Sequence, residues 1–333
     1  MGINIYAEGF EACYYLIMSK KILLSGIQPS GRPHIGNYFG AMKQFVDLQD
    51  EYESCIFIAD YHALHTLRDP KMMNENIKNV LLDYLAIGLD PKKVTIYKQS
   101  DIGEHTELAW IFDTLVTMPY LMRAHAFKDA EAKNKEISVG TFNYPVLQSA
   151  DILMYDADVV PVGQDQKQHI EIARDIALKF NNQYGETFKL PESLILENVS
   201  IVPGTDGQKM SKSYGNIIPL FATKDEVKKA VMSIVTDSGE GIPENVYNIH
   251  KLLRNEEELK NLYEEKKGKY KDLKEALLED IEKLLEPMRE KRVYWEAHID
   301  EALEILKSGG EKMKQKASQK MEMVREKLGV KVY

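Results

Sequence analysis

The sequence has few cysteines and no long hydrophobic run. Only Cys13 and Cys55 occur among 333 residues, which is too few for a disulfide framework or for a metal site built from cysteine pairs. No stretch reaches the roughly 18–20 apolar residues that a membrane-spanning helix requires. These absences exclude the disulfide-rich secreted class and an integral membrane protein, and they favour the reducing cytoplasm.

The chain also lacks an overall positive charge. It carries 43 Lys and Arg against 52 Asp and Glu, a net charge of −9. The average argues weakly against a nucleic-acid partner, but phosphate contacts need only a local basic face. Residues 311–333 hold seven Lys and Arg against three Glu. This segment is interpreted either as a solvated helix face, which is favoured, or as a contact for RNA phosphates.

Strands and helices alternate in the first two thirds of the chain. Apolar runs predict strands at 21–25, 53–58 and 94–98, and longer patterns predict helices at 36–50, 70–87 and 103–116. Asp69 and Pro70 form a helix start. This alternation predicts an α/β fold with a Rossmann-like parallel sheet. Ligands of such sheets bind beyond the carboxyl ends of the strands.

The composition changes near residue 219, which predicts two domains. We expect an α/β domain over residues 18–219 and a helical domain over residues 220–333. Helices are predicted at 223–235, 255–264, 270–288 and from about 293, with a break or bend at Gly309-Gly310. Residues 1–17 have neither a basic leader nor a small-residue cleavage site. We hypothesise that they form a non-native or disordered extension before Met18.

The first strand is followed by a turn that has the features of a phosphate site. Residues 25–37 read SGIQPSGRPHIGN, and backbone N–H groups at a helix start attract anions. His34 and Asn37 are three residues apart and share a face, so both can donate to a phosphate. Gly36 permits a flat base to lie against the backbone. The alternative is a Gly- and Pro-rich loop without a ligand.

A lysine-containing loop lies about 170 residues further along the chain, where residues 209–213 read KMSKS after Gly204 and Gly207. Lys209 and Lys212 can close over a triphosphate and neutralise the leaving pyrophosphate. Such a loop by itself is usually a solvated basic turn. Its combination with the His-Ile-Gly-Asn turn favours phosphate binding.

Two further segments supply polar side chains. Residues 144–152 read YPVLQSADI, where Pro145 is expected to begin a helix that carries Tyr144, Gln148, Asp151 and Tyr155 on one face. A carboxylate among apolar neighbours needs a donor, and an indole N–H is a donor without acceptor capacity. The alternative for Asp151 is a salt bridge to a neighbouring helix.

Residues 160–169 read VPVGQDQKQH and form another turn that opens a helix. Gly163 allows a ligand close to the backbone, and Asp165 can accept from two ribose hydroxyls. His62 follows the second predicted strand. A lone histidine in such a position is more often structural than functional.

These motifs resemble the HIGH and KMSKS signatures of class I aminoacyl-tRNA synthetases, in the HIGN variant typical of the tryptophanyl family. The likeness to bacterial members of that family extends over residues 21–333. It implies a catalytic domain, an anticodon-binding domain, a homodimer, and ATP with Mg²⁺ but without a protein-bound metal site. It also implies activation of tryptophan and its transfer to tRNA(Trp) in the cytoplasm.

The resemblance assigns roles residue by residue. The implied catalytic residues are His34, Asn37, Lys209 and Lys212. The implied ATP-binding residues are Gln28, Pro29, Ser30, Gly36, Asn37, Gly163, Gln164, Asp165, Ile201, Lys209, Met210, Ser211, Lys212 and Ser213. The implied tryptophan-binding residues are Asp151, Tyr144, Gln148, Gln166 and His62.

The sequence departs from the family pattern at two positions and lacks a site that some members carry. Gln164 stands where Glu is more common, and Ala130 stands where the family has a second lysine. Lys128 and Lys133 are the two candidates to replace that lysine. No cysteine follows Cys55, so the four-cysteine iron–sulfur site of some members is absent.

Three rival interpretations remain. A tyrosyl-tRNA synthetase shares the fold and the ATP motifs, but the sequence around Asp151 and Asp165 argues against it. A small adenylyltransferase needs no KMSKS loop. A catalytically silent RNA-binding paralogue would not need to retain all six of the key polar residues, which are His34, Asn37, Asp151, Asp165, Lys209 and Lys212.

Overall fold

The centre of the molecule is a parallel sheet, seen in a computed structural model that describes residues 20–132, 137–163, 166–195, 202–236 and 241–333. The strands follow the order β3-β2-β1-β4-β5, and every pairing is parallel. Their bounds are β1 Ile22–Ile27, β2 Glu53–Ile58, β3 Val94–Lys98, β4 Val159–Pro161 and β5 Glu192–Leu194. The predicted Rossmann-like α/β fold is confirmed. The hypothesis on residues 1–17 lies outside the described residues.

The strand sequences explain the burial of the sheet. Five of the six residues of β2 are buried, as expected for a strand covered by helices on both faces. The predicted strands at 53–58 and 94–98 match β2 and β3. The first strand begins and ends later than the predicted 21–25.

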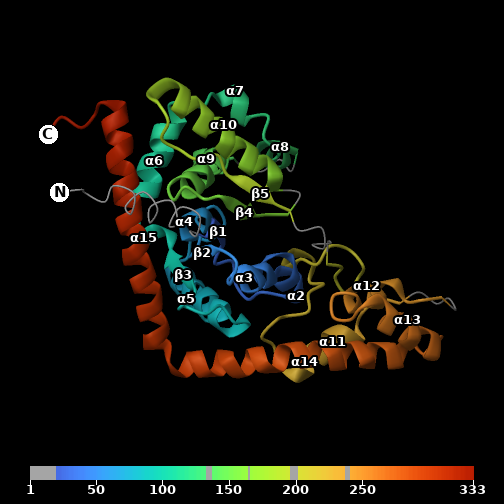
Figure 1. Cartoon of the computed structure of the whole chain (residues 1–333). Helices are drawn as coiled ribbons and strands as arrows, with labels where there is room; N and C mark the ends of the chain where they lie inside the picture. Colours follow the sequence, from blue (N-terminus) through green and yellow to red (C-terminus); the bar gives the residue numbers. More distant parts are fainter. Residues whose placement is uncertain (1–19, 133–136, 164–165, 196–201, 237–240) are drawn as a thin grey trace, which may run out of the picture.

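Helices connect the strands and cover the sheet (Figure 1). The bounds are α2 Ile35–Asn37, α4 Asp60–Ala63, α5 Pro70–Ile87, α6 Glu104–Asp113, α7 Met118–Leu121, α8 His125–Ala132, α9 Val139–Leu153 and α10 Lys167–Tyr184. The predicted helix at 36–50 is interrupted by a π-helical segment, η1 Tyr38–Met42, before α3 Lys43–Leu48. The predicted start at Asp69 is confirmed, because its side chain accepts from the N–H of Lys71 and of Met72.

The predicted helix start at Pro145 is wrong. Helix α9 begins six residues earlier, at Val139, and Pro145 lies inside it. The Ser138 side chain accepts a hydrogen bond from the N–H of Thr141 and thereby caps the helix at that earlier position. A proline inside a helix removes one backbone hydrogen bond, and the packing of the buried residues that follow Pro145 outweighs this loss.

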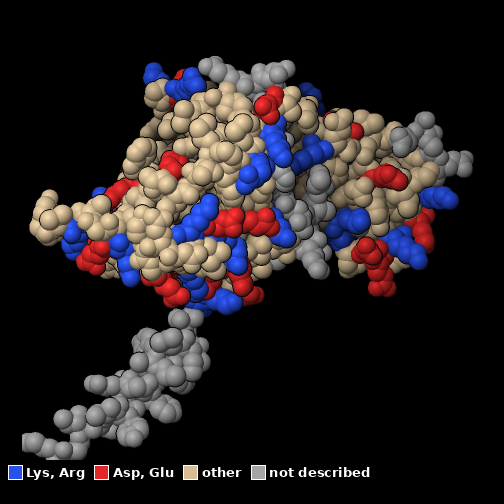
Figure 2. Space-filling model, turned by 90° about the horizontal axis from the view of Figure 1, so that it is seen from above, with Lys and Arg blue, Asp and Glu red and all other residues tan. Residues whose placement is uncertain are grey.

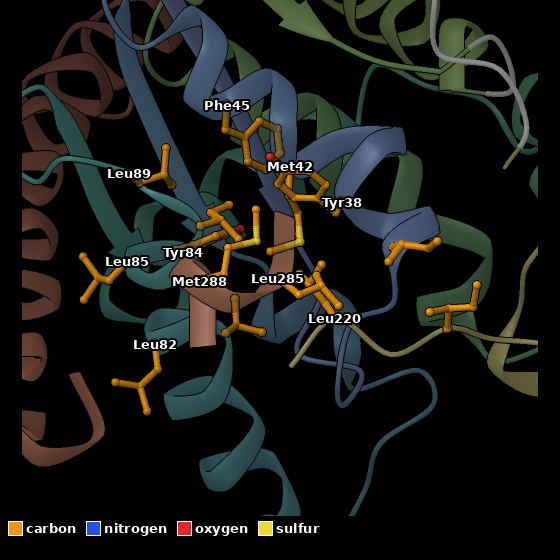
Figure 3. Packing of buried hydrophobic residues seen from close by; sticks show 14 of the residues in the cluster. Tyr38, Met42, Phe45, Leu82, Tyr84, Leu85, Leu89, Leu220, Leu285 and Met288 are labelled. Carbon is orange, nitrogen blue, oxygen red and sulfur yellow. The ribbon is translucent and has the colours of Figure 1, made fainter. Parts of the chain in front are cut away.

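The last third of the described chain is helical. It contains α11 Lys224–Met232, α12 Glu244–His250, α13 Glu256–Glu265, α14 Tyr270–Ala297 and α15 Ile299–Leu328. Figure 1 shows α14 and α15 meeting at a corner, with α11 to α13 beside α14 and with α15 alongside β3. The domain boundary between residues 219 and 220 stays a prediction. Side chains from both sides of it share one core, where Leu285 and Met288 of α14 lie near Tyr84 and Met42 (Figure 3).

The predicted break or bend at Gly309-Gly310 is wrong, because α15 continues through both residues. An ideal Cβ at Gly309 would lie 1.9 Å from the carbonyl oxygen of Ile96 in β3. The glycine therefore allows the helix backbone to pack directly on the strand, and this packing outweighs the low helix propensity of glycine.

The basic segment 311–333 faces carboxylates of the α/β part. Lys316 pairs with Glu53 at 2.7 Å, Lys320 with Asp156 at 2.7 Å, and Arg325 with Glu107 at 2.5 Å. Lys312 donates instead to the hydroxyl of Thr95. Figure 2 shows Lys and Arg interleaved with Asp and Glu on the face in view. Much of the positive charge on α15 therefore holds this helix on the sheet domain.

Candidate active site

A cavity of about 930 Å³ opens beyond the carboxyl ends of β1, β2 and β4. Its wall includes Gln28, His62, Asp151, Gly163 and Lys209. The sheet order places β1 between β2 and β4. The chain adds β2 and β3 on one side of β1 and then β4 and β5 on the other side, so the strand order reverses at β1. Parallel sheets bind ligands at such a reversal, and the volume suits a small-molecule site.

His34 and Asn37 hold each other at the start of α2. The imidazole Nδ1 of His34 accepts from the Asn37 N–H at 3.3 Å, and Asn37 Oδ1 accepts from the His34 N–H at 3.1 Å. Burial, with the nearby charge of Lys212, lowers the pKa of His34 to about 4. The ring is therefore neutral near pH 7, and its proton is on Nε2 because Nδ1 is an acceptor. His34 is thus prepared as a hydrogen-bond donor.

Gly36 has a second use besides the predicted contact with a base. An ideal Cβ on this residue would lie 2.8 Å from Nδ1 of His34 and 3.3 Å from Cβ of Met210. A side chain would therefore separate the first turn from the lysine loop. The contact with a base stays a prediction.

The two signature motifs are adjacent in space. The N–H of Ile35 donates to the carbonyl of Ile218 at 3.0 Å, and the N–H of Leu220 donates to the carbonyl of Pro33 at 3.0 Å. Lys212 extends back over the first turn, where its Nζ lies 3.0 Å from the carbonyl oxygens of both Ser30 and Gly31. Burial lowers the pKa of Lys212. Both predicted phosphate-binding segments therefore face one region.

Asp151 is fully buried at the cavity wall and accepts hydrogen bonds from three elements. The partners are His62 in α4 at 2.8 Å, Gln99 in η2 (Gln99–Asp101) at 2.8 Å and His105 in α6 at 2.6 Å. Burial alone would raise the pKa of Asp151, but His105 and His62 bring it well below the usual range. Asp151 is therefore an ionised carboxylate that only accepts hydrogen bonds.

Sequence reasoning found His62 and Asp151 but missed Gln99 and His105. A signal existed for Gln99, since it directly follows β3 at the carboxyl edge of the sheet. His105 carried no such signal. Its Nε2 lies 2.8 Å from the hydroxyl of Tyr155, which the sequence predicts to share a helix face with Asp151 and which lies in the turn directly after α9.

The other predicted tryptophan-pocket residues also line the cavity. They are Tyr144, Gln148 and Gln166. The ring of Tyr144 meets three imidazoles edge-on, with centroid distances of 6.4 Å to His62, 5.7 Å to His65 and 5.5 Å to His169. These contacts restrict the orientation of the phenol beside the cavity.

The remaining predicted residues differ in their relation to the cavity. Gln28, Asn37, Gly163 and Lys209 line the cavity, and Met210 is a buried residue of the lysine loop. Pro29, Ser211 and Ser213 lie in the two motif segments without lining it. Gln164, Asp165, Ile201 and Lys133 lie outside the described residues. Lys128 is exposed on α8, and its phosphate contact stays a prediction.

The described residues contain neither a cluster of metal-ligating side chains nor a membrane-spanning helix. Among these residues, no three His, Cys, Asp or Glu side chains lie where they could hold a metal ion together. No helix within the same ranges is long and apolar enough to cross a membrane.

Known proteins resemble the chain over most of its length. The profile of the family described as tRNA synthetases class I (W and Y) matches residues 19–304. A tryptophan–tRNA ligase of Fusobacterium nucleatum is 51% identical over 316 residues, which cover 92% of this chain and 97% of that protein. A tryptophan–tRNA ligase of Rhodopirellula baltica is 44% identical over 317 residues, with 92% and 99% covered.

Solved structures show the same likeness. The crystal structure of tryptophanyl-tRNA synthetase from Campylobacter jejuni, complexed with ADP and tryptophan, has a TM-score of 0.85 and 43% identity, and the match covers 92% of this chain and 99% of that one. A tyrosyl-tRNA synthetase from Archaeoglobus fulgidus has a TM-score of 0.66 at 22% identity, covering 86% of this chain and 94% of that one. This second likeness concerns the fold alone.

Proposed function

The chain belongs to the class I tRNA synthetases of the tryptophan and tyrosine type, and from this premise we propose that it activates tryptophan with ATP and joins it to tRNA(Trp). Relatives that are 44–51% identical are tryptophan–tRNA ligases, which favours tryptophan over tyrosine. The observation that carries the proposal is the buried carboxylate of Asp151 at the cavity wall. We place the reaction in the cytoplasm, where tRNA is charged.

The cavity suits the amino acid. The indole N–H donates to Asp151, whose other hydrogen bonds hold its oxygens in place. Tyr144, Gln148, Gln166 and His62 surround the rest of the amino acid. A buried polar group that lacks its partner is costly, so an amino acid without a donor at this point is rejected.

The nucleotide lies between the two motif segments in this proposal. Gln28, Gly36 and Gly163 contact its base and sugar region, with Asp165 on the ribose. His34, Asn37, Lys209 and Lys212 face the phosphates. Mg²⁺ comes with the nucleotide and neutralises part of the phosphate charge.

Activation is a displacement at phosphorus. One carboxylate oxygen of tryptophan attacks the α-phosphorus in line, the bond to the β-phosphate oxygen breaks, and pyrophosphate leaves with its electron pair. The protein supplies positioning and hydrogen-bond donors to the phosphate oxygens rather than a covalent intermediate. Nε2–H of His34 is prepared for this task because the ring is neutral. Lys212 exchanges its contacts with Ser30 and Gly31 for contacts with phosphate, which strengthen in the transition state.

In the second step, the 2′-hydroxyl of the terminal tRNA ribose attacks the carbonyl carbon of the adenylate, and AMP leaves. The helical part from residue 220 binds the anticodon in this proposal. Contacts with phosphate make such binding salt-dependent. Several cations of α15 already pair with carboxylates of the α/β part, which leaves fewer of them for RNA.

We propose that the chain forms a homodimer through exposed apolar side chains of the α6, α7 and α10 region. Trp110 of α6 is 71% exposed, and Met118 of α7, Met122 directly after α7 and Leu178 of α10 are also exposed. These three helices lie together at one end of the molecule (Figure 1). Trp and Met are enriched at protein interfaces, and we assign this face to a second copy of the chain.

Amino-acid-dependent ATP–pyrophosphate exchange tests the proposed function. Purified protein is assayed with tryptophan, with tyrosine and with no amino acid. We expect exchange with tryptophan alone. Exchange with tyrosine instead would overturn the role of Asp151 and leave the fold assignment intact. No exchange with any amino acid would favour a silent RNA-binding paralogue.

A further inference from the structure

The side chain of Asn216 connects the parts of the lysine loop. It is 3% exposed, although most of the loop lies at the surface. Its Oδ1 accepts from the N–H of Ser211 at 2.7 Å. Its Nδ2 donates to Oδ1 of Asp206 at 2.7 Å and to the carbonyl of Lys209 at 3.2 Å.

These bonds fix the backbone on both sides of Met210. The carbonyl of Lys209 and the N–H of Ser211 flank this residue, and its own N–H donates to the carbonyl of Val202 at 3.0 Å. The loop path between the two lysines therefore depends on one amide. A long cationic side chain loses considerable rotamer entropy when it is ordered, and a fixed backbone lowers the cost of placing it on a phosphate.

The space around the side chain of Asn216 fits an amide and nothing larger. An ideal Cβ at Gly204 would lie 2.3 Å from Nδ2 of Asn216, so this glycine makes room for the side chain. The hydrogen bond from Asn216 also lowers the pKa of Asp206. One end of the side chain must accept and the other must donate, and only an amide of this length provides both.

We infer that Asn216 is a positioning residue that sets Lys209 and Lys212 for the phosphates of ATP. The inference rests on the proposed function, since it concerns the same exchange reaction. It assigns no contact between Asn216 and substrate. Asn216 acts through the backbone of the two lysines, so its loss affects ATP and leaves the tryptophan pocket unchanged.

The test is the isosteric substitution Asn216→Asp in tryptophan-dependent ATP–pyrophosphate exchange. The carboxylate keeps the acceptor for Ser211, but it faces the carboxylate of Asp206 and the carbonyl of Lys209 without a proton to donate. We expect kcat/KM for ATP to fall at least about tenfold, because the phosphate donors lose their placement. The KM for tryptophan should stay within about twofold of wild type.

Asn181 provides a matched control. Its Oδ1 accepts from the N–H of Thr187 and of Phe188, and its Nδ2 donates to the carbonyl of Phe188. Asn181 thus organises another loop in the same way, away from the cavity lining. Asn181→Asp should lower the unfolding temperature and leave kcat/KM for ATP unchanged.

Two combinations separate positioning from a general loss of folding. In a Lys212→Ala background, Asn216→Asp should add much less than its effect alone, because residues that act as a unit are non-additive. The exchange of partners, Asp206→Asn with Asn216→Asp, returns a donor and an acceptor to the pair and should restore part of kcat/KM for ATP. The swap remains informative if Asn216→Asp alone does not fold.

The outcomes are distinguishable. Wild-type protein without tryptophan-dependent exchange overturns the proposed function. Active wild type together with folded Asn216→Asp of unchanged kcat/KM for ATP overturns the role of Asn216. The role of Asn216 is also overturned if Asn216→Asp lowers kcat/KM equally for ATP and for tryptophan. The same holds if its effect on kcat/KM for ATP is fully additive with that of Lys212→Ala, because either result indicates a structural role.

Discussion

Nδ1 of His105 lies 2.6 Å from a carboxylate oxygen of Asp151, and both side chains are almost completely buried. The two residues come from α6 and α9, and His62 from α4 reaches the other oxygen. The carboxylate is therefore fixed by helices that follow different strands. Asp151 also lines the cavity, which is where the proposed function places the indole N–H.

Asp151→Asn should raise the KM for tryptophan by about two orders of magnitude, because an amide cannot accept from all the donors that surround this position. Pyrophosphate exchange at varied tryptophan concentration measures the effect. Asp175→Asn is the control, since Asp175 is likewise a carboxylate that accepts a side-chain hydrogen bond, from the phenol of Tyr120, but it does not line the cavity. An unchanged KM would show that Asp151 does not read the indole.

Lys212→Ala should lower the rate of tryptophan-dependent exchange by about two to three orders of magnitude, because a donor to the developing phosphate charge is lost. Tryptophan binding, followed by equilibrium dialysis, should change little. Lys224→Ala, which removes a surface lysine paired with Glu286, should leave the rate unchanged. A Lys212→Ala rate equal to wild type would refute the role.

His34 should make the fold less stable in acid. Its pKa is about 4 in the folded protein and about 6.5 when unfolded. Between these values only the unfolded chain binds the proton, so the unfolding free energy falls as pH decreases from about 6.5 to about 4. The loss attributable to His34 is about 3 kcal/mol. Urea unfolding at several pH values measures this loss. Between pH 6.5 and pH 4, the unfolding free energy of His34→Gln should fall by about 3 kcal/mol less than that of the wild type. If the two proteins lose the same unfolding free energy, the assignment to His34 is wrong.

Gly309→Ala should destabilise the protein by about 3 kcal/mol, since the added methyl group collides with the backbone of β3. Gly310→Ala is the matched control in the same helix. Its ideal Cβ meets only the side chain of Asp101, with the one tight contact at 3.2 Å to a carboxylate oxygen, and this carboxylate can rotate. Alanine there gains helix propensity of up to about 1 kcal/mol. The unfolding free energy of both variants is measured in urea. If Gly309→Ala and Gly310→Ala have equal unfolding free energies, the close approach of α15 to β3 is not the reason for the glycine at 309.

Trp110→Glu should convert a dimer into a monomer, because a charge replaces the largest apolar side chain of the proposed interface. Sedimentation velocity of the wild type and the variant measures the change. Val293→Glu, at a similarly exposed apolar position on α14, should leave the dimer intact. If the wild type is a monomer, or if Trp110→Glu is still a dimer, this surface is not the dimer interface.

The sequence by itself determined the local elements and the chemical character of the site. The runs at 53–58 and 94–98 predicted β2 and β3 because buried parallel strands are continuously apolar. Asp69 and Pro70 predicted the start of α5 because capping depends on neighbouring residues alone. The His-Ile-Gly-Asn turn and the KMSKS loop predicted a phosphate site from residue type and spacing, and the structure places them side by side.

Only the tertiary structure decided which distant groups meet. Gly309-Gly310 suggested a break because glycine favours breaks in isolated helices, whereas contact with β3 keeps α15 continuous. Pro145 suggested a helix start because the fixed φ of proline suits the first turn of a helix. The cap at Ser138 and the packing of α9 place the start at Val139 instead. His105 and Asn216 have no distinctive local pattern, and Gln99 is marked only by its place directly after β3. Their roles arise from hydrogen bonds between segments that the fold brings together, and local sequence does not encode such distances.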